Sequence, residues 1–139
     1  VAYAQARVFE AIQAIRQTPP FTNAASLRPV RVAVLDTGFE PALLSEFTAP
    51  SGLRVVRLLR PDRFNANGGF SPSSSLFDRD GHGTTVTSVI AAVNDGVGTS
   101  GVLNSVFREG EEPFAVDVYD ISAFRQGLDQ QYIYGALAD

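Results

Sequence analysis

The sequence predicts an α/β fold with three layers, in which helices cover both faces of a mainly parallel sheet. Three short apolar runs rich in β-branched residues alternate with segments of helical spacing, an order typical of βαβ units. The chain has 139 residues, of which 45% are hydrophobic and 19% charged, as in folded globular proteins. We therefore expect one domain, or part of one.

The opening segment, residues 1–28, predicts a helix and a connection. Apolar residues between Val1 and Thr18 recur at helical spacing, and two prolines then end the pattern. The next run, residues 30–35, is apolar and mostly β-branched and leads into Asp36. It predicts a buried strand followed by a turn.

The remainder of the chain predicts two further strands and two further helices. We expect strands over residues 53–59 and 114–121, and helices over 83–93 and 126–137. Residues 60–80 are rich in Pro, Asn, Gly and Ser, so they predict a long surface loop.

The composition argues against several classes of protein. Cysteine is absent, so disulfides, thiolate metal sites and a cysteine nucleophile are excluded. All 11 basic residues are arginines without a clustered basic face, and the net charge is -4, so we expect no nucleic-acid partner. No run reaches the roughly 20 apolar residues of a membrane span. Because methionine is also absent, we expect a processed or excised piece of a longer protein.

Asp36 and His82 are the candidate catalytic residues. Asp36 follows a predicted buried strand, and ligands of open α/β sheets bind beyond the carboxyl ends of such strands. His82 is the single histidine and lies where the predicted loop meets the helix over residues 83–93. A carboxylate can orient an imidazole and stabilise the imidazolium that forms when its other nitrogen takes a proton. Taken singly, a turn aspartate and a surface histidine remain open alternatives.

Two motifs carry a family resemblance. The segment 32–38, Val-Ala-Val-Leu-Asp-Thr-Gly, resembles the aspartate motif of subtilisin-like serine proteases (subtilases, peptidase S8 family), and 81–92, which begins Gly-His-Gly-Thr, resembles their histidine motif. The motifs occur in the family's order, about 46 residues apart. The resemblance covers residues 30–102, with 103–139 as a variable segment, strand and helix. It implies a subtilisin-type fold of which this chain supplies about half.

The resemblance implies a serine endopeptidase that hydrolyses polypeptide substrates. Asp36 would orient the imidazole, and His82 would act as general base and then as general acid. The family's serine and oxyanion-hole motifs are not found here, so we expect them in a missing C-terminal half, and we expect this chain alone to be inactive. Ser100 follows His82 by only about 18 residues and has no proline-bearing helix after it, so we do not expect it to be the nucleophile. Thr85 stands where relatives usually have a second histidine.

A structural calcium ion is the one cofactor that the resemblance suggests, and none is required. Residues 93–99 resemble a calcium-binding loop, with the Asp95 side chain and the carbonyl groups of Val93, Val97 and Thr99 as ligands. No clear counterpart follows Asp36 for the aspartate that relatives add to this site. A plain Asn-Asp-Gly turn therefore remains an equal alternative.

Other functions stay open. The chain could be an inactive half-domain or pseudoenzyme that acts as a structural or binding module, and the gene sequence beyond Asp139 would decide this. Residues 78–81, Asp-Arg-Asp-Gly, resemble the signature of haloacid-dehalogenase-like phosphatases, but a hydrophobic strand does not precede them. The uncovered edge of a half-sheet predicts dimerisation or exchange of an element between chains. The family resemblance favours secretion or the cell envelope, and the sequence does not fix the compartment.

Overall fold

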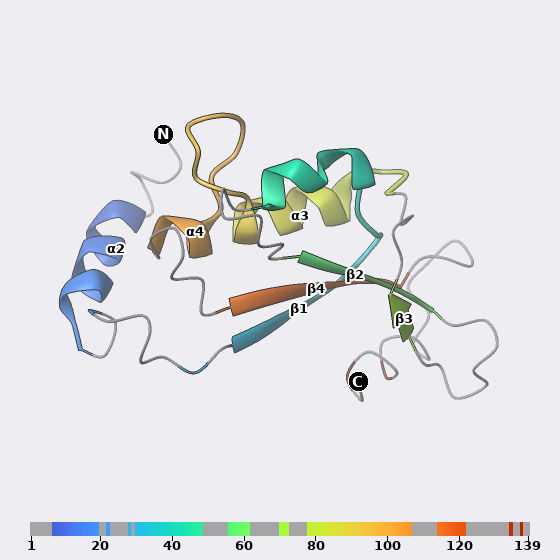
Figure 1. The fold of residues 1–139 in the computed structure, drawn as a ribbon, viewed down its shortest axis with the longest axis horizontal. Coiled ribbons are helices and arrows are strands. Elements are labelled where there is room, and N and C mark those ends of the chain that lie inside the picture. Colours follow the sequence, from blue (N-terminus) through green and yellow to red (C-terminus); the bar gives the residue numbers. More distant parts are fainter. Residues whose placement is uncertain are drawn as a thin grey trace.

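The chain adopts a mixed α/β fold (Figure 1). The computed structural model describes residues 7–19, 22, 28, 30–48, 56–61, 70–72, 78–106, 114–121, 134 and 137. In chain order, the described elements are α2 (Val8–Gln17), β1 (Val30–Asp36), the 3-10 helix η2 (Pro41–Phe47), β2 (Val56–Pro61), β3 (Phe70–Pro72), α3 (His82–Ala91), α4 (Val102–Val106) and β4 (Phe114–Asp120).

Four strands form one sheet in the order β1-β4-β2-β3. The last strand along the chain, β4, lies between β1 and β2 and is parallel to both, whereas β3 is antiparallel to β2. Asp36 at the end of β1 pairs in register with Asp120 at the end of β4. Within the described sheet β1 is therefore an edge strand, and Asp36 lies at the carboxyl edge of its parallel part.

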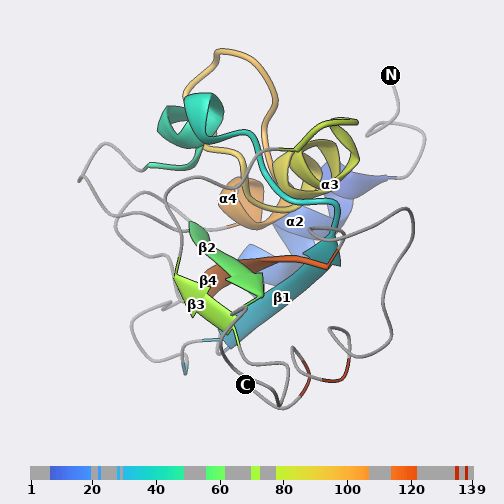
Figure 2. The ribbon, with the colours of Figure 1, turned by 90° about the vertical axis from the view of Figure 1, so that its right-hand side faces the viewer.

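The main core lies between the sheet and the helices above it. Alternate apolar residues of the parallel strands point to this face, and α3, α4 and η2 lie over it (Figures 1 and 2). Removing such an apolar face from water is the main stabilising contribution to a small α/β unit. The buried members of this core are Val34, Phe39, Phe47, Val56, Leu58, Ala91, Ala92, Phe114, Val116 and Val118.

The opposite face carries an ion-pair cluster around the buried Asp117. Asp117 in the central strand β4 is 4% exposed and accepts hydrogen bonds from Nε of Arg31 at 3.0 Å and from Nε of Arg57 at 2.9 Å. Burial by itself raises the pKa of Asp117, but the hydrogen bonds from Arg57 and Arg31 outweigh it and hold this pKa below its ordinary value. The three side chains join β1, β4 and β2 across the sheet.

Most of the predicted elements are present, and three are new. The predicted strands at 30–35, 53–59 and 114–121 correspond to β1, β2 and β4, and the predicted helix at 83–93 corresponds to α3. The strand β3 lies inside the stretch that the sequence predicts to be a loop, and the helices η2 and α4 were not predicted. Asp78 does belong to this loop, but it is buried rather than at the surface, with 6% exposed.

The remaining predictions about the fold are only partly covered. The helix predicted from Val1 is described from Val8 onward. The closing helix predicted over 126–137 lies outside the described residues except for Tyr134 and Leu137. Within the described part of the chain, no helix is both long and apolar enough to cross a bilayer.

Candidate active site

Asp36 occupies the last position of β1, where the sheet's hydrogen bonding ends. Its main-chain oxygen accepts a hydrogen bond from the Ile121 N–H at 3.0 Å, which ties the end of β1 to the end of β4. Its side chain is 14% exposed, and Oδ1 accepts a hydrogen bond from the Thr37 N–H at 2.7 Å. The carboxylate is therefore held by the turn that follows the strand.

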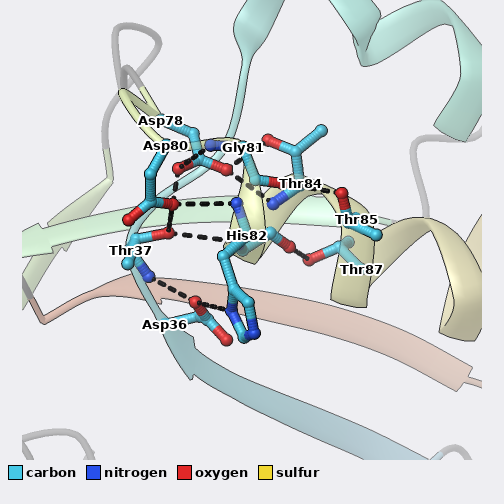
Figure 3. A network of polar contacts seen from close by, with 10 residues as sticks. Asp36, Thr37, Asp78, Asp80, Gly81, His82, Thr84, Thr85 and Thr87 are labelled. Atoms are coloured by element: carbon cyan, nitrogen blue, oxygen red, sulfur yellow. Dashed lines mark hydrogen bonds and ion pairs between the residues drawn. The ribbon is translucent and has the colours of Figure 1, made fainter.

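His82 is the first residue of α3, and its ring lies against Asp36. The His82 Nδ1 and Asp36 Oδ1 atoms are 2.8 Å apart, across 46 positions of sequence (Figure 3). The His82 side chain is 68% exposed, and its Nε2 has no hydrogen-bond partner among the described residues. The two residues that the sequence singles out are thus brought together, with one imidazole nitrogen bonded and the other accessible.

The carboxylates around His82 favour its protonated form. The hydrogen bond that Asp36 accepts from His82 and the charge of Asp36 raise the pKa of His82 above its ordinary value of 6.5, and the charges of Asp80 and Asp78 act in the same direction. Neutral His82 then keeps its proton on Nδ1, where Asp36 accepts it. This tautomer leaves the Nε2 lone pair free to take a proton from another group.

Close backbone contact sets the position of α3 against β1. A Cβ atom on Gly83 would lie 2.3 Å from the main-chain oxygen of Gly38, a separation that real Cβ atoms do not reach. Gly38 itself has a φ of 116°, which favours glycine. Glycine at both positions lets the first turn of the helix meet the turn after the strand directly. The Gly-containing motifs therefore have a packing reason as well as a sequence resemblance.

Asp78 binds the first residues of α3 and the residue before them. Its carboxylate accepts hydrogen bonds from the Thr84 N–H at 2.8 Å and the Thr84 hydroxyl at 2.7 Å, from the Thr37 hydroxyl at 2.8 Å, and from the Gly81 N–H at 3.1 Å. Burial raises the pKa of Asp78, but these bonds, those of Thr84 foremost, outweigh burial and lower the pKa below its ordinary value. Asp78 therefore stays ionised near neutral pH.

Sequence reasoning did not assign a role to Asp78 or Thr37 in this site. One signal was present: the residue before His82 is Gly81, which has no side chain to cap the helix. The amides of the first turn of α3 must then find acceptors elsewhere, and Asp78 and Asp80 are the nearest carboxylates in the sequence. Thr37 carries no such local signal because it is 46 positions from the amide it binds.

Comparisons with family models, with curated proteins and with solved structures give no match for this chain. A carboxylate that holds one imidazole nitrogen while the other is accessible is the arrangement of a general base.

The candidate calcium loop has an acidic neighbour that the sequence did not reveal. The Asp95 carboxylate accepts a hydrogen bond from the Val97 N–H at 2.9 Å, within an exposed loop. Glu46 of η2 reaches this loop: its main-chain oxygen accepts from the Val93 N–H at 2.7 Å, and its Oε2 would lie 3.0 Å from a Cβ on Gly98. No group of three or more acidic or histidine side chains that could hold a metal ion occurs among the described residues, so carbonyl groups such as that of Thr99 would have to complete an ion's coordination.

Ser100 lies at the far end of α3 from His82. Its hydroxyl donates to Oδ1 of Asn94 at 3.1 Å, and the adjacent Gly101 packs against the backbone of Ala91 and Ala92, the last turn of the helix. A helix of 10 residues is about 15 Å long, so its two ends are well separated. This placement agrees with the expectation that Ser100 is not the nucleophile for His82.

Proposed function

We propose that Asp36 and His82 are the orienting carboxylate and the general base of a subtilisin-like serine protease. The observation that carries the proposal is the 2.8 Å contact between Asp36 Oδ1 and His82 Nδ1, because it joins two motifs that are distant in sequence and leaves the other imidazole nitrogen to act as a base. The subtilisin-type, three-layer architecture and the hydrolysis of polypeptide substrates are part of the same proposal.

In the proposed reaction, a serine from a part of the protease domain outside this chain attacks the peptide carbonyl. His82 Nε2 takes the hydroxyl proton as the Oγ–C bond forms, and Asp36 stabilises the resulting imidazolium. The imidazolium then protonates the leaving amine as the C–N bond breaks, which leaves an acyl-enzyme. Water, activated by the same imidazole, hydrolyses the ester and restores the serine.

The exposure of His82 and the position of Asp36 at a sheet edge support a nucleophile that lies outside this chain. His82 is 68% exposed, so Nε2 is accessible to a group that does not belong to the described residues. The edge strand β1 pairs only with β4 in the described sheet, and Asp36 lies at its end. We propose that the rest of the protease domain covers this edge; a second copy of the chain is the alternative occupant. Light scattering of the isolated chain distinguishes a monomer from a dimer.

Labelling with a fluorophosphonate probe tests the proposed activity. The probe is applied to this chain, to the full-length parent protein and to the parent carrying His82→Ala. We expect the parent to be labelled, and the chain and the His82→Ala parent to remain unlabelled. Labelling of the isolated chain that disappears in Ser100→Ala would show that Ser100 is the nucleophile. A parent that is never labelled would contradict the protease assignment.

We further propose a structural calcium ion in the loop over residues 93–99. The Asp95 carboxylate, the side chain of Glu46 and carbonyl groups of Val93, Val97 and Thr99 would supply oxygen ligands, which calcium prefers. The proximity of Glu46 to the loop supports this proposal, because it supplies a second negative charge. The ion's role would be to stabilise the loop after α3, without taking part in the proton transfers.

A further inference from the structure

We propose that Thr37 is a positioning residue that sets the contact between Asp36 and His82, an inference that rests on the proposed function. Thr37 is bonded to both sides of the pair. Its N–H donates to Asp36 Oδ1 at 2.7 Å, and its hydroxyl oxygen accepts from the N–H of Gly83, the residue after His82, at 3.0 Å (Figure 3).

The helix that carries His82 depends on side chains outside it for its first turn. The N-terminal amides of an α-helix have no partner within the helix, and here the N-cap residue Gly81 offers no side chain. The His82 N–H donates to Asp80 Oδ1, the Gly83 N–H to Thr37 Oγ1 and the Thr84 N–H to Asp78 Oδ2. Of these three acceptors, only Thr37 belongs to the turn that follows β1. It therefore joins the start of the helix to the end of the strand.

The buried carboxylate of Asp78 fixes the direction of the Thr37 hydroxyl. Oγ1 of Thr37 lies 2.8 Å from Asp78 Oδ1 and 3.0 Å from Asp80 Oδ1, and its single proton is shared between these two acceptors. With the proton directed to the carboxylates, a lone pair of the hydroxyl faces the Gly83 N–H. Charge-assisted bonds to a carboxylate are stronger than neutral ones, so this orientation is well determined.

The relative position of β1 and α3 determines whether Asp36 and His82 can form their hydrogen bond. A hydrogen bond weakens steeply when its distance and angle leave a narrow range, so the Asp36–His82 bond requires that β1 and α3 keep their relative position. Backbone contact of Gly83 with Gly38 prevents the elements from approaching further. The Thr37 hydroxyl prevents them from separating. Together they hold the two donor and acceptor atoms 2.8 Å apart.

The single histidine allows this inference to be tested without enzymatic activity. The pKa of His82 is measured by NMR titration of its ring protons in the chain and in four variants, of which Asp36→Asn is the reference for a lost contact. Thr37→Val removes the hydroxyl at nearly constant volume and keeps the N–H, whereas Thr37→Ser keeps both. Thr87→Val is the matched control, because the buried Thr87 hydroxyl donates to the main-chain oxygen of Gly83 within the same helix.

We expect Thr37→Val to lower the pKa of His82 toward 6.5 by roughly half or more of the decrease in Asp36→Asn. Thr37→Ser and Thr87→Val should keep the wild-type value. A folded Thr37→Val protein with an unchanged His82 pKa would overturn the inference, because a merely structural threonine would change stability and leave the titration as it is.

Amide exchange of the wild-type chain decides the matter if Thr37→Val does not fold. The Gly83 N–H should be protected, and Thr37→Ser should preserve the protection; exchange at the rate of an unprotected amide would overturn the inference. Fluorophosphonate labelling of the parent separates this result from the proposed function. If the parent is labelled and the His82 pKa is unchanged in Thr37→Val, only the role of Thr37 is refuted. If the parent is not labelled and the His82 pKa is lowered in Thr37→Val, only the protease assignment is refuted.

Discussion

Gly83 of α3 lies so close to Gly38 of the turn after β1 that a Cβ atom on Gly83 would be 2.3 Å from the Gly38 main-chain oxygen. The same added atom would lie 3.2 Å from the Cβ of Asp36. The start of the helix that carries His82 therefore packs directly against the turn that follows Asp36. The catalytic proposal depends on this backbone contact, and it makes a clear prediction for substitution.

Gly83→Ala should destabilise the fold because neither backbone element can move away without breaking hydrogen bonds. We expect a loss of about 3 kcal/mol, at the upper end of the usual cost of overpacking. Gly96→Ala is the control: Gly96 has a φ of 85° and no atom near its added Cβ, so only backbone strain of about 1 kcal/mol is expected. Urea denaturation measures both, and equal losses would show that the contact of Gly83 with Gly38 is not restrictive.

The pH dependence of His82 should follow from its carboxylate partner. Because its pKa in the folded protein is raised above 6.5, the stability it contributes is fully present below the unfolded-state pKa and is lost as pH rises through the folded-state pKa. Catalysis has the opposite sign, since the base must be neutral. We expect kcat/KM of the parent to rise with pH to a midpoint above 6.5.

Asp36→Asn should remove most of this shift. The amide can still contact the ring, but it has no charge to stabilise the imidazolium, so the NMR midpoint of His82 should fall toward 6.5. Asp95→Asn, in the exposed loop beyond the far end of α3, is the matched control and should leave the midpoint unchanged. A midpoint that stays high in Asp36→Asn would mean that Asp36 does not control the ionisation of His82.

The ion-pair cluster around Asp117 should make the stability of the sheet sensitive to acid. Asp117 has a pKa below its ordinary value of 3.8, so its stabilising effect is present above that value and is lost as pH falls through the folded-state pKa. Asp117→Asn should cost about 2 kcal/mol at neutral pH, because bonds to two guanidinium groups lose their charge. Glu10→Gln, at an exposed position in α2, is the control and should cost only a few tenths of a kcal/mol. Equal losses of stability for the two variants in urea denaturation would contradict the role of the cluster.

Calcium should raise the thermal stability of the chain if the loop over residues 93–99 binds it. An ion present at about 100 times its dissociation constant adds about 2.7 kcal/mol to the free energy of unfolding. Chelation should remove this increment, and Asp95→Ala or Glu46→Gln should abolish the response to added calcium. A wild-type Tm that does not change with calcium or with chelator would rule out the site.

The sequence predicted those elements whose signal is local. β4 is an apolar run that is buried along nearly its whole length, and α3 shows helical spacing, so their patterns reflect their surroundings. The run over residues 30–35 also forms a strand, but the expectation that it is buried was wrong, because β1 lies at the edge of the described sheet and only Val34 is buried. β3 has only three residues and includes a proline, and its pairing with Leu59–Pro61 depends on β2 rather than on its own composition. Short elements of this kind cannot be recognised from residue type alone.

The sequence by itself determined which residues could carry the chemistry. A single histidine in a glycine-rich helix start and an aspartate at a strand end limited the choice to His82 and Asp36. Only the tertiary structure decided that they meet at 2.8 Å, that Asp78 is buried beneath the helix start, and that Thr37 joins the two elements. The physical reason is that the Asp36–His82 contact and the contact of Thr37 with Gly83 each span 46 positions of sequence. Local pattern fixes the element, and packing of one backbone on another fixes the site.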